Sequence, residues 1–351
     1  MNSSSYHHRL PNTIAWLRFP LIFLIIMLHC YSVVRIPGDH NTYFKSIYPF
    51  SLWLGETGVP GFFFISGFLF YFSKKSYRQK LETRFHTLLI PYLLWNAALL
   101  IIYLTAYAVG HPQDINGKNL TDFGFYDYIR LFWDRGSYDD GNFVPLLCPL
   151  WYIRNLLIMS VLSPVIYYII WYTREVFLIA ITVWWLTTFH NAFIPQTFLF
   201  FCLGAYFSIF NINPLQFFSE RKRMFLTLFS LFAFGDIFLH VTADSPVNLQ
   251  IHRLAIIFNI PILFLLADYS VLHGFSSKLL TNATFIVFCV HYPIVVSLRK
   301  YCVAKFTEAP DYIHILLFFV CIAISTFVSL LFFLLLNNFF PKIKNIISGN
   351  R

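Results

Sequence analysis

Long apolar stretches dominate this sequence and set the first constraint on its fold. Hydrophobic residues make up 58% of the 351 positions and charged residues only 12%, which is about half the charge expected of a soluble domain. A helix needs about 20 largely apolar residues to cross a bilayer, and these runs lack the alternation of a membrane β-barrel. We predict ten membrane helices, at residues 13–34, 48–73, 86–109, 146–172, 175–190, 193–210, 224–241, 253–270, 281–298 and 312–339. The expected fold class is therefore an all-α integral membrane protein, a bundle of about ten transmembrane helices.

Charged residues in the short connections give this bundle a direction. Basic residues gather between the second and third segments, between the sixth and seventh, and after the last: Lys74, Lys75, Arg78, Lys80, Arg84, Arg221, Lys222, Arg223, Lys342, Lys344 and Arg351. In a ten-helix bundle these connections lie on one side, and the positive-inside rule places that side and both termini in the cytoplasm. Three basic residues in the loop 299–311 run against the rule. The longest loop, 110–145, then lies outside and is acidic, with Asp114, Asp122, Asp127, Asp134, Asp139 and Asp140.

Composition also limits the classes of function. The net charge of +9 comes largely from these topology-setting residues and does not indicate nucleic-acid binding. The six cysteines are scattered singly, so we expect packing residues rather than disulfides or metal ligands. The first apolar run is too long for a cleavable signal peptide, and we expect a turn at 190–192 between the fifth and sixth segments. We expect one transmembrane domain over residues 1–351, with no separate soluble domain, so any chemistry takes place inside the bundle or at its mouths.

Two ionisable residues in the first segment, Arg18 and His29, point to such chemistry. Their spacing of eleven residues places both on one stripe of a helix, ~16 Å apart along its axis. An ionisable group inside a membrane helix costs several kcal/mol unless it faces a polar interior, so it marks function by default. In this topology Arg18 lies near the cytoplasmic end and His29 about three turns further out. Two simpler interpretations are that Arg18 snorkels to the interface and that His29 is a hydrogen-bonded structural residue.

Further candidates recur in later segments, each beside a distinctive run. The second segment carries Glu56 at its outer mouth and Ser66 within the run 59–68, VPGFFFISGF. Small residues there allow close helix approach or a locally broken helix. The third segment begins with the run 84–92, RFHTLLIPY, and the fourth with 150–154, LWYIR. The ninth segment carries His291 in its outer half.

In this order on ten helices, these runs resemble the acyltransferase 3 family, the multi-pass membrane O-acyltransferases that modify cell-surface glycans. The most specific match is the Arg-x10-His spacing of Arg18 and His29, followed by VPGFFFISGF, which is similar to the family's V-P-x-F-F-x-I-S-G-F. Pro60 places the chain nearer the branch of enterobacterial-common-antigen and fucose O-acetylases, since another branch has Asp there. Many relatives carry a second arginine where Thr87 stands, and some carry a periplasmic esterase-like domain beyond the point where this sequence ends.

The resemblance implies a membrane O-acyltransferase of the bacterial cytoplasmic (inner) membrane. The donor would be acyl-CoA, most often acetyl-CoA, entering from the cytoplasm. The acceptor would be a sugar hydroxyl of a lipid-linked or surface polysaccharide, and other polysaccharide-synthesis proteins are possible partners. We expect no permanently bound cofactor and no metal, because no His or Cys spacing suggests ligands.

Roles for the candidate residues follow from this resemblance. His29 is expected to act as general base, with an acyl-histidine intermediate as the alternative. Arg18 is expected to orient the donor or stabilise developing negative charge. The candidates for binding the donor are Arg84, Arg78 and Lys80. The candidates for binding the acceptor are Glu56, Ser66, Trp151, Arg154 and His291. Glu56 and His291 are also candidates for orienting His29.

Simpler interpretations stand beside these roles. His291, Glu56 and Arg154 are also compatible with structural roles, Trp151 with an aromatic belt, and Arg78 and Lys80 with setting the topology. The aromatic residues of the outer loop either stack on sugar rings or form an amphipathic helix on the membrane surface: Phe123, Phe125, Tyr126, Tyr128, Phe132 and Trp133.

A different class of function is a transporter or flippase for a lipid-linked glycan, which would also have buried charges and broken helices. The sequence shows no second copy of the Arg18–His29 pattern, as an inverted repeat would. A membrane scaffold is a third class, and it leaves the burial of Arg18 and His29 unexplained.

Overall fold

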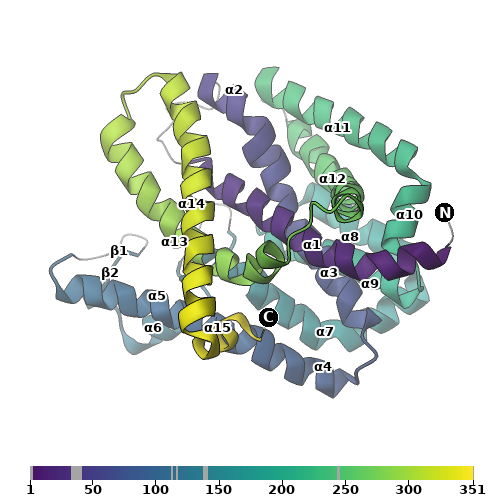
Figure 1. The fold of residues 1–351 in the computed structure, drawn as a ribbon, viewed down its shortest axis with the longest axis horizontal. Helices are drawn as coiled ribbons and strands as arrows, with labels where there is room; N and C mark the ends of the chain where they lie inside the picture. Colours follow the sequence, from purple (N-terminus) through teal and green to yellow (C-terminus); the bar gives the residue numbers. More distant parts are fainter. Residues whose placement is uncertain are drawn as a thin grey trace. The chain divides into compact units, whose positions relative to one another are not determined.

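The computed structural model describes residues 3–32, 42–111, 114–115, 118–136, 141–242 and 246–350, and these are almost entirely helical (Figure 1). The helices are α1 (Ser3–Cys30), α2 (Thr42–Tyr48), η1 (Pro49–Leu54), η2 (Gly55–Thr57), α3 (Gly58–Phe72), α4 (Tyr77–Arg84), η3 (Phe85–Leu89), α5 (Ile90–Ala108), η4 (Leu120–Asp122), α6 (Phe125–Arg130), η5 (Cys148–Leu150), α7 (Trp151–Thr173), α8 (Glu175–Thr187), α9 (Phe193–Ile209), α10 (Pro214–Glu220), α11 (Lys222–Thr242), α12 (Pro246–Leu272), α13 (Lys278–Phe306), α14 (Asp311–Phe339) and α15 (Pro341–Ser348). Two short strands, β1 (Asp114–Ile115) and β2 (Lys118–Asn119), pair antiparallel. The last two positions of the first predicted segment, and Asp139 and Asp140 of the outer loop, lie outside the described residues.

Within the described residues, eight helical spans are long and apolar enough to cross a membrane. They are Ser5–Cys30, Thr42–Phe72, Tyr77–Ala108, Cys148–Thr173, Lys222–His240, Asn248–Leu272, Lys278–Phe306 and Asp311–Phe339. The pair α9 and α10, bent by 94°, makes a ninth if it is one span. The fifth predicted segment is α8, whose 13 residues are fewer than the ~20 that a bilayer requires. The expected class, an all-helical membrane bundle, is confirmed, with eight or nine clear spans where the sequence predicted about ten.

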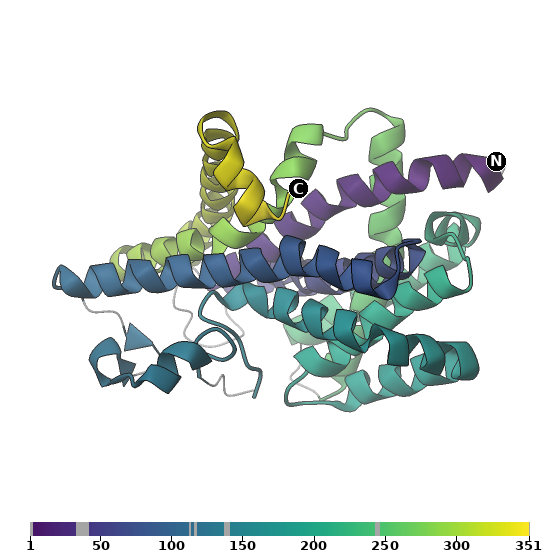
Figure 2. The ribbon, with the colours of Figure 1, turned by 90° about the horizontal axis from the view of Figure 1, so that it is seen from below.

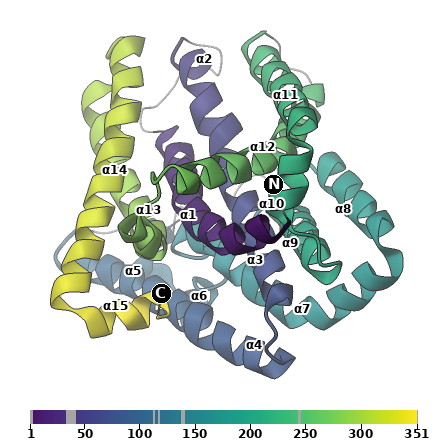
Figure 3. The same ribbon diagram turned by 45° about the vertical axis from the view of Figure 1, so that its right-hand side comes forward.

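The chain divides into two compact units. The first unit comprises Met1–Phe72 and Leu203–Phe333, and the second comprises Ser73–Cys202 and Leu334–Arg351. In the first unit, α1 packs against α3, α12 and α13, and α11 lies along α12 (Figure 3). This unit therefore surrounds the helix that carries Arg18 and His29.

Helix α1 begins ten residues earlier than the sequence predicted, at Ser3 rather than residue 13. The additional turns are polar, and α12 pairs with Arg9 among them and with Thr13, the first residue of the predicted segment. The Arg9 Nε lies 3.3 Å from Asp268 Oδ1, and the Thr13 hydroxyl donates to the same oxygen at 3.2 Å. Hydropathy alone missed these turns because their residues are largely polar, with His7, His8 and Asn12 exposed and Arg9 paired with a distant helix.

The second predicted segment begins earlier and is locally broken, at Thr42 rather than residue 48. Regular helix gives way to the π-helical η1 and the 3₁₀-helical η2 before α3 begins at Gly58. Both alternatives proposed for its small residues occur. A Cβ atom on Gly58 would lie 2.8 Å from the Leu21 carbonyl oxygen of α1, and one on Gly204 would lie 1.9 Å from the Phe64 carbonyl oxygen of α3. Glycine at these positions lets the backbones approach closely.

The basic connection before the third segment is helical, which corrects the expectation of a loop. Ser76 and Gln79 form a capping box at the start of α4, and α4, η3 and α5 form one span from Tyr77 to Ala108. Figure 2 shows this span as one continuous blue rod. The donor candidates Arg78, Lys80 and Arg84 therefore lie on a rigid helix.

The turn predicted at 190–192 is present. Residues 188–192 join α8 to α9, and Asn191 adopts a left-handed conformation with φ of 54°. Asparagine tolerates this region better than most residues, which explains its place at the turn.

Candidate active site

His29 of α1 and His291 of α13 lie side by side in the first unit. Their ring centroids are 5.4 Å apart, and the Tyr292 ring meets His29 edge-on at 5.0 Å. The sequence separates the two histidines by most of the chain, and the packing of α1 against α13 brings them together. His291 is fully buried, whereas His29 retains partial exposure, so His29 is the member of the pair that a substrate can reach.

A backbone hydrogen bond orients His291. Its Nδ1 lies 3.1 Å from the Val287 carbonyl oxygen, one helical turn earlier, and therefore donates to it. In the neutral ring Nε2 then carries the lone pair, and among the described residues this buried atom has no hydrogen-bond partner. His291 thus has an unused acceptor nitrogen, and its ring lies beside that of His29.

Arg18 and His29 share the single helix α1, as predicted. Eleven residues of helix separate them by ~16 Å along the axis. Arg18 is half-buried, and so is Ser66 of α3, another predicted acceptor contact. An arginine side chain spans roughly half of that axial separation, so Arg18 and His29 act at different points of any shared substrate.

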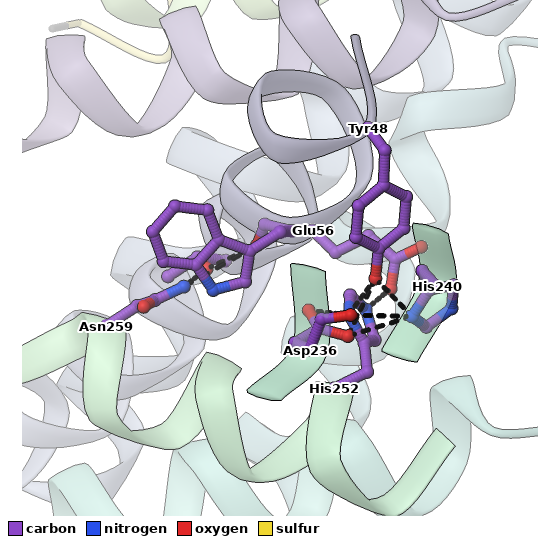
Figure 4. Close-up of polar contacts among 8 residues, drawn as sticks. Tyr48, Glu56, Asp236, His240, His252 and Asn259 are labelled. Carbon is purple, nitrogen blue, oxygen red and sulfur yellow. Dashed lines mark hydrogen bonds and ion pairs between the residues drawn. The ribbon is translucent and has the colours of Figure 1, made fainter. Parts of the chain in front are cut away.

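Glu56 takes part in a network of five ionisable or hydroxyl side chains in the first unit (Figure 4). His252 bridges two carboxylates, with Nδ1 2.8 Å from Asp236 Oδ2 and Nε2 3.0 Å from Glu56 Oε2. The Tyr48 hydroxyl donates to Asp236 Oδ1 at 2.7 Å. His240 Nδ1 lies 2.8 Å from that hydroxyl and 3.0 Å from Asp236 Oδ1. We call these residues the Asp236 network.

Four members of the network were not predicted from the sequence: Tyr48, Asp236, His240 and His252. The signal that identified Arg18 and His29 was also present here, since Asp236 and His240 are ionisable residues inside an apolar segment, one turn apart. His252, which pairs with Asp236, lies just before the predicted eighth segment. Hydropathy gave no indication that these positions would meet.

Within the described residues, the network does not form a metal site. No three His, Cys, Asp or Glu side chains converge as metal ligands there. The imidazole nitrogens of His252 are instead directed at carboxylate oxygens, which makes the network a set of hydrogen bonds and ion pairs.

Two other predicted acceptor contacts, Trp151 and Arg154, make packing and hydrogen-bond contacts within the second unit. Trp151 stacks on Phe193 at 3.9 Å. The buried Arg154 guanidinium donates to the carbonyl oxygens of Trp133 and Phe143, at 2.6 and 3.0 Å. These contacts tie the outer loop to the start of α7. Their predicted role in binding the acceptor stays a prediction.

The outer loop exposes aromatic side chains on the short helix α6. Phe125 and Tyr126 are 83% and 74% exposed. The loop contains the short helix α6, and both interpretations of its aromatic rings, contact with a sugar or with a membrane surface, stay predictions.

The second unit has an open cavity of about 420 Å³ beside α4, lined by Lys75, Gln79, Glu82, Thr83 and His86. Positions 79, 82, 83 and 86 form one helical stripe. The Lys75 ammonium donates to the Thr83 hydroxyl at 3.2 Å. The predicted donor contact Arg78 lies outside this stripe and pairs with Glu82 at 3.1 Å. Lys75 and His86 line the cavity and were not among the donor contacts predicted from the sequence.

The C-terminal residues pack against Thr87 at the start of the third predicted segment. Gly349, with φ of 67°, lies so close to Thr87 that a Cβ atom on it would sit 2.4 Å from the Thr87 carbonyl oxygen. The Trp95 indole also donates to the Ile347 carbonyl oxygen at 3.0 Å. Both contacts lie within the second unit, and they fix α15 against the span that begins with α4.

Comparison with known proteins identifies the family. A family model described as an acyltransferase domain matches residues 12–334 and so takes in most of both units. The chain belongs to the acyltransferase 3 family. The resemblance noted in the sequence is therefore confirmed, and the protein is a multi-pass membrane protein with an acyltransferase domain.

One characterised relative adds to this assignment. The chain is similar to the succinoglycan biosynthesis protein ExoH of Rhizobium meliloti (strain 1021), with 25% identity over 266 residues, 70% of this chain and 68% of that protein. No solved structure gives a significant match.

Proposed function

We propose that this acyltransferase moves an acyl group, most simply acetyl, from cytoplasmic acyl-CoA to a sugar hydroxyl of a surface or lipid-linked polysaccharide. Its place would be the bacterial cytoplasmic membrane. The observation that carries the proposal is the His29–His291 pair inside an acyltransferase domain. The similar protein ExoH is named for the biosynthesis of succinoglycan, a polysaccharide, which supports a glycan acceptor.

His29 is the proposed general base. The neutral imidazole carries one nitrogen lone pair, which accepts the proton as the sugar oxygen attacks the thioester carbonyl. The new C–O bond forms, the C–S bond breaks, and the proton passes to the CoA sulfur. His291, held by its bond to Val287, is the positioning residue that keeps the His29 ring in place.

Arg18 is proposed to orient the donor rather than to stabilise the reacting carbonyl. Its distance along α1 from His29, ~16 Å, is too large for both side chains to reach one carbonyl group. A guanidinium binds phosphate and polar carbonyl oxygens through several N–H donors. In the second unit, Arg84, Arg78 and Lys80, together with Lys75 and His86 of the cavity, are the candidate contacts for CoA phosphates.

A transporter or flippase is the second candidate, and the Asp236 network is the observation that favours it. Buried chains of carboxylates and histidines in apolar helices are typical of proton-coupled carriers. A carrier would move a glycan across the bilayer without consuming acyl-CoA, which separates the two functions in one assay.

Purified protein in lipid nanodiscs, given labelled acetyl-CoA and oligosaccharide acceptors, tests the proposal. We expect acyl transfer by the parent protein and a loss of about 10²–10⁴-fold for His29→Ala. Arg18→Ala is expected to raise the KM for acetyl-CoA. The matched control is His273→Ala, an exposed histidine just after α12. Transfer by His29→Ala at the parent rate would exclude the assigned mechanism, and glycan movement without CoA release would favour the carrier.

A further inference from the structure

The Asp236 network changes from fully buried to open along its length. The exposed fraction of the side chain is 0% for Asp236, 9% for His252 and 42% for Glu56. Asp236 holds Nδ1 of His252, so the opposite nitrogen, Nε2, is directed at Glu56. The network therefore holds the Glu56 carboxylate in a fixed position at its open end.

The two carboxylates of the network are balanced by cationic side chains. Both nitrogens of His252 face carboxylate oxygens, and with both carboxylates ionised a histidine can donate to both only as the imidazolium. The buried Arg253 follows His252 on α12 and adds a second cation to this segment. Two anions are thus opposed by two cations. A neutral hydrogen-bonding ligand suits such a site better than an ion, which would have to displace one of the partners.

Two buried groups on the same segments have unused hydrogen-bonding capacity. Trp53 Nε1 and Asn259 Oδ1 have no hydrogen-bond partner among the described residues, and their residues are 8% and 1% exposed. Trp53 lies three residues before Glu56, and Asn259 lies two turns along α12 from His252. One group is a donor and the other an acceptor. Both atoms are closed to solvent, so the accessible hydrogen-bonding group of this region is the Glu56 carboxylate at the open end of the network.

Glu56 lies on the segment that packs against the end of α1. A Cβ atom on Gly55 would lie 3.0 Å from Leu28 Cβ, the residue directly before His29. The element η2, which carries Glu56, therefore contacts the same turn of α1 that carries the proposed base. A ligand held at Glu56 is placed beside the end of the bundle where the acceptor would react.

The reaction itself gives the network no protons to carry. Acyl transfer from a thioester to a hydroxyl forms an ester and a thiol, and the hydroxyl proton ends on the sulfur. No net proton is released, so an acyltransferase does not need this network as an exit path. Its rigid geometry instead suits recognition, because an ionised carboxylate forms strong hydrogen bonds with hydroxyl groups.

We propose that Glu56 binds hydroxyl groups of the acceptor sugar, and that His252, Asp236 and Tyr48 are positioning residues that hold Glu56 for this purpose. The inference rests on the proposed acyl transfer to a glycan. It specifies the acceptor as a sugar that is neutral where it meets Glu56.

Steady-state kinetics with labelled acetyl-CoA and neutral hexose oligosaccharides tests this inference. Glu56→Gln keeps the size of the side chain and removes its charge, and should raise the KM for the oligosaccharide about tenfold or more. Tyr48→Phe keeps the aromatic packing and removes the bond to Asp236, and should raise the same KM about threefold. For both variants the KM for acetyl-CoA should stay within twofold of the parent, roughly the precision of such assays. A merely structural role would lower the amount of active enzyme without separating the two KM values.

The matched controls are Glu308→Gln and Tyr269→Phe, both exposed positions of the first unit. Unchanged oligosaccharide KM in Glu56→Gln, with active parent enzyme, overturns the inference and leaves the proposed function intact. An equal rise in the KM of both substrates also overturns it. If the parent protein transfers no acyl group in vitro and adds no ester to the polysaccharide of expressing cells, the proposed function itself fails. Proton-driven sugar movement by that inactive parent would assign the network to transport.

Discussion

Two polar regions of this protein, the Asp236 network of the first unit and the exposed face of α4 in the second, are built in opposite ways. Tyr48 and Asp236 are 188 residues apart in sequence, and Glu56 and His252 are 196 apart. On α4 the partners are local, since Arg78 pairs with Glu82 one turn away. Asp236 is fully buried, whereas the Arg78 side chain is 90% exposed.

The difference shows which polar side chains can be substituted without a large loss of stability. A buried carboxylate among apolar helices must keep its partners, because no water replaces a lost hydrogen bond. An exposed ion pair gains little, because water and salt screen it. The network should therefore respond to single substitutions through stability and geometry, and the α4 face through charge and ionic strength.

The largest contrast should appear in stability. Asp236→Ala leaves His252 and the Tyr48 hydroxyl without their shared acceptor and should destabilise the first unit by about 3 kcal/mol or more. Glu82→Ala on α4 removes an exposed pair and should change stability by less than about 0.5 kcal/mol. Thermal unfolding of detergent-solubilised protein, followed by tryptophan fluorescence, measures both. Equal shifts of the unfolding temperature in Asp236→Ala and Glu82→Ala would contradict the difference in stability between the two regions.

A moderate effect is expected from salt on donor binding. Lys75→Ala in the cavity beside α4 should weaken acetyl-CoA binding about threefold at low ionic strength, and the difference should shrink as the Debye length falls to ~3 Å near 1 M salt. Lys278→Ala, an exposed lysine of the first unit, is the matched control. Titration calorimetry in nanodiscs gives the dissociation constants. A salt-independent loss on Lys75→Ala would mean that it acts through packing rather than charge.

The smallest effect concerns an exposed pair of the outer loop. The Lys118 ammonium, together with the Gly124 N–H, donates to Asp127 and lowers the pKa of this carboxyl below its usual 3.8. The resulting stabilisation of the loop is present above the unfolded pKa and is lost as the pH falls through the lower, folded value. A carbon NMR titration of Asp127 should show this lowered pKa, and Lys118→Ala should move it back toward 3.8. Lys118→Arg keeps the charge and should keep most of the shift. An unchanged titration in Lys118→Ala would assign the effect to the helix end instead.

The sequence predicted the parts of the site that follow from position along one helix. Arg18 and His29 share a stripe because the spacing of eleven residues sets it, and the structure has them on the single helix α1. A locally broken helix was one of the two alternatives predicted from the small residues of the second segment. The extension of α1 to Ser3 was missed, because its residues are largely polar and the partner of Arg9, Asp268, lies far along the chain.

The sequence could not predict which ionisable residues meet. His291 was a candidate, yet its position 5.4 Å from His29 depends on how α13 packs against α1. Asp236 and His240 carry the signal of ionisable residues inside an apolar segment, yet nothing in the sequence indicates that His252 and Glu56 would meet them. Partner choice between helices depends on interhelical packing, and a hydropathy pattern specifies a face of a helix without specifying its neighbour.

The sequence by itself determined the class of this protein, its family and the helix that carries the proposed base, because hydrophobic length, loop charge and residue spacing are local properties. Only the tertiary structure decided that His29 faces His291 and that Glu56 is held through His252 by a buried Asp236. The physical reason is that a buried polar group in an apolar bundle must find its partners inside the protein, and those partners come from segments nearly two hundred residues away.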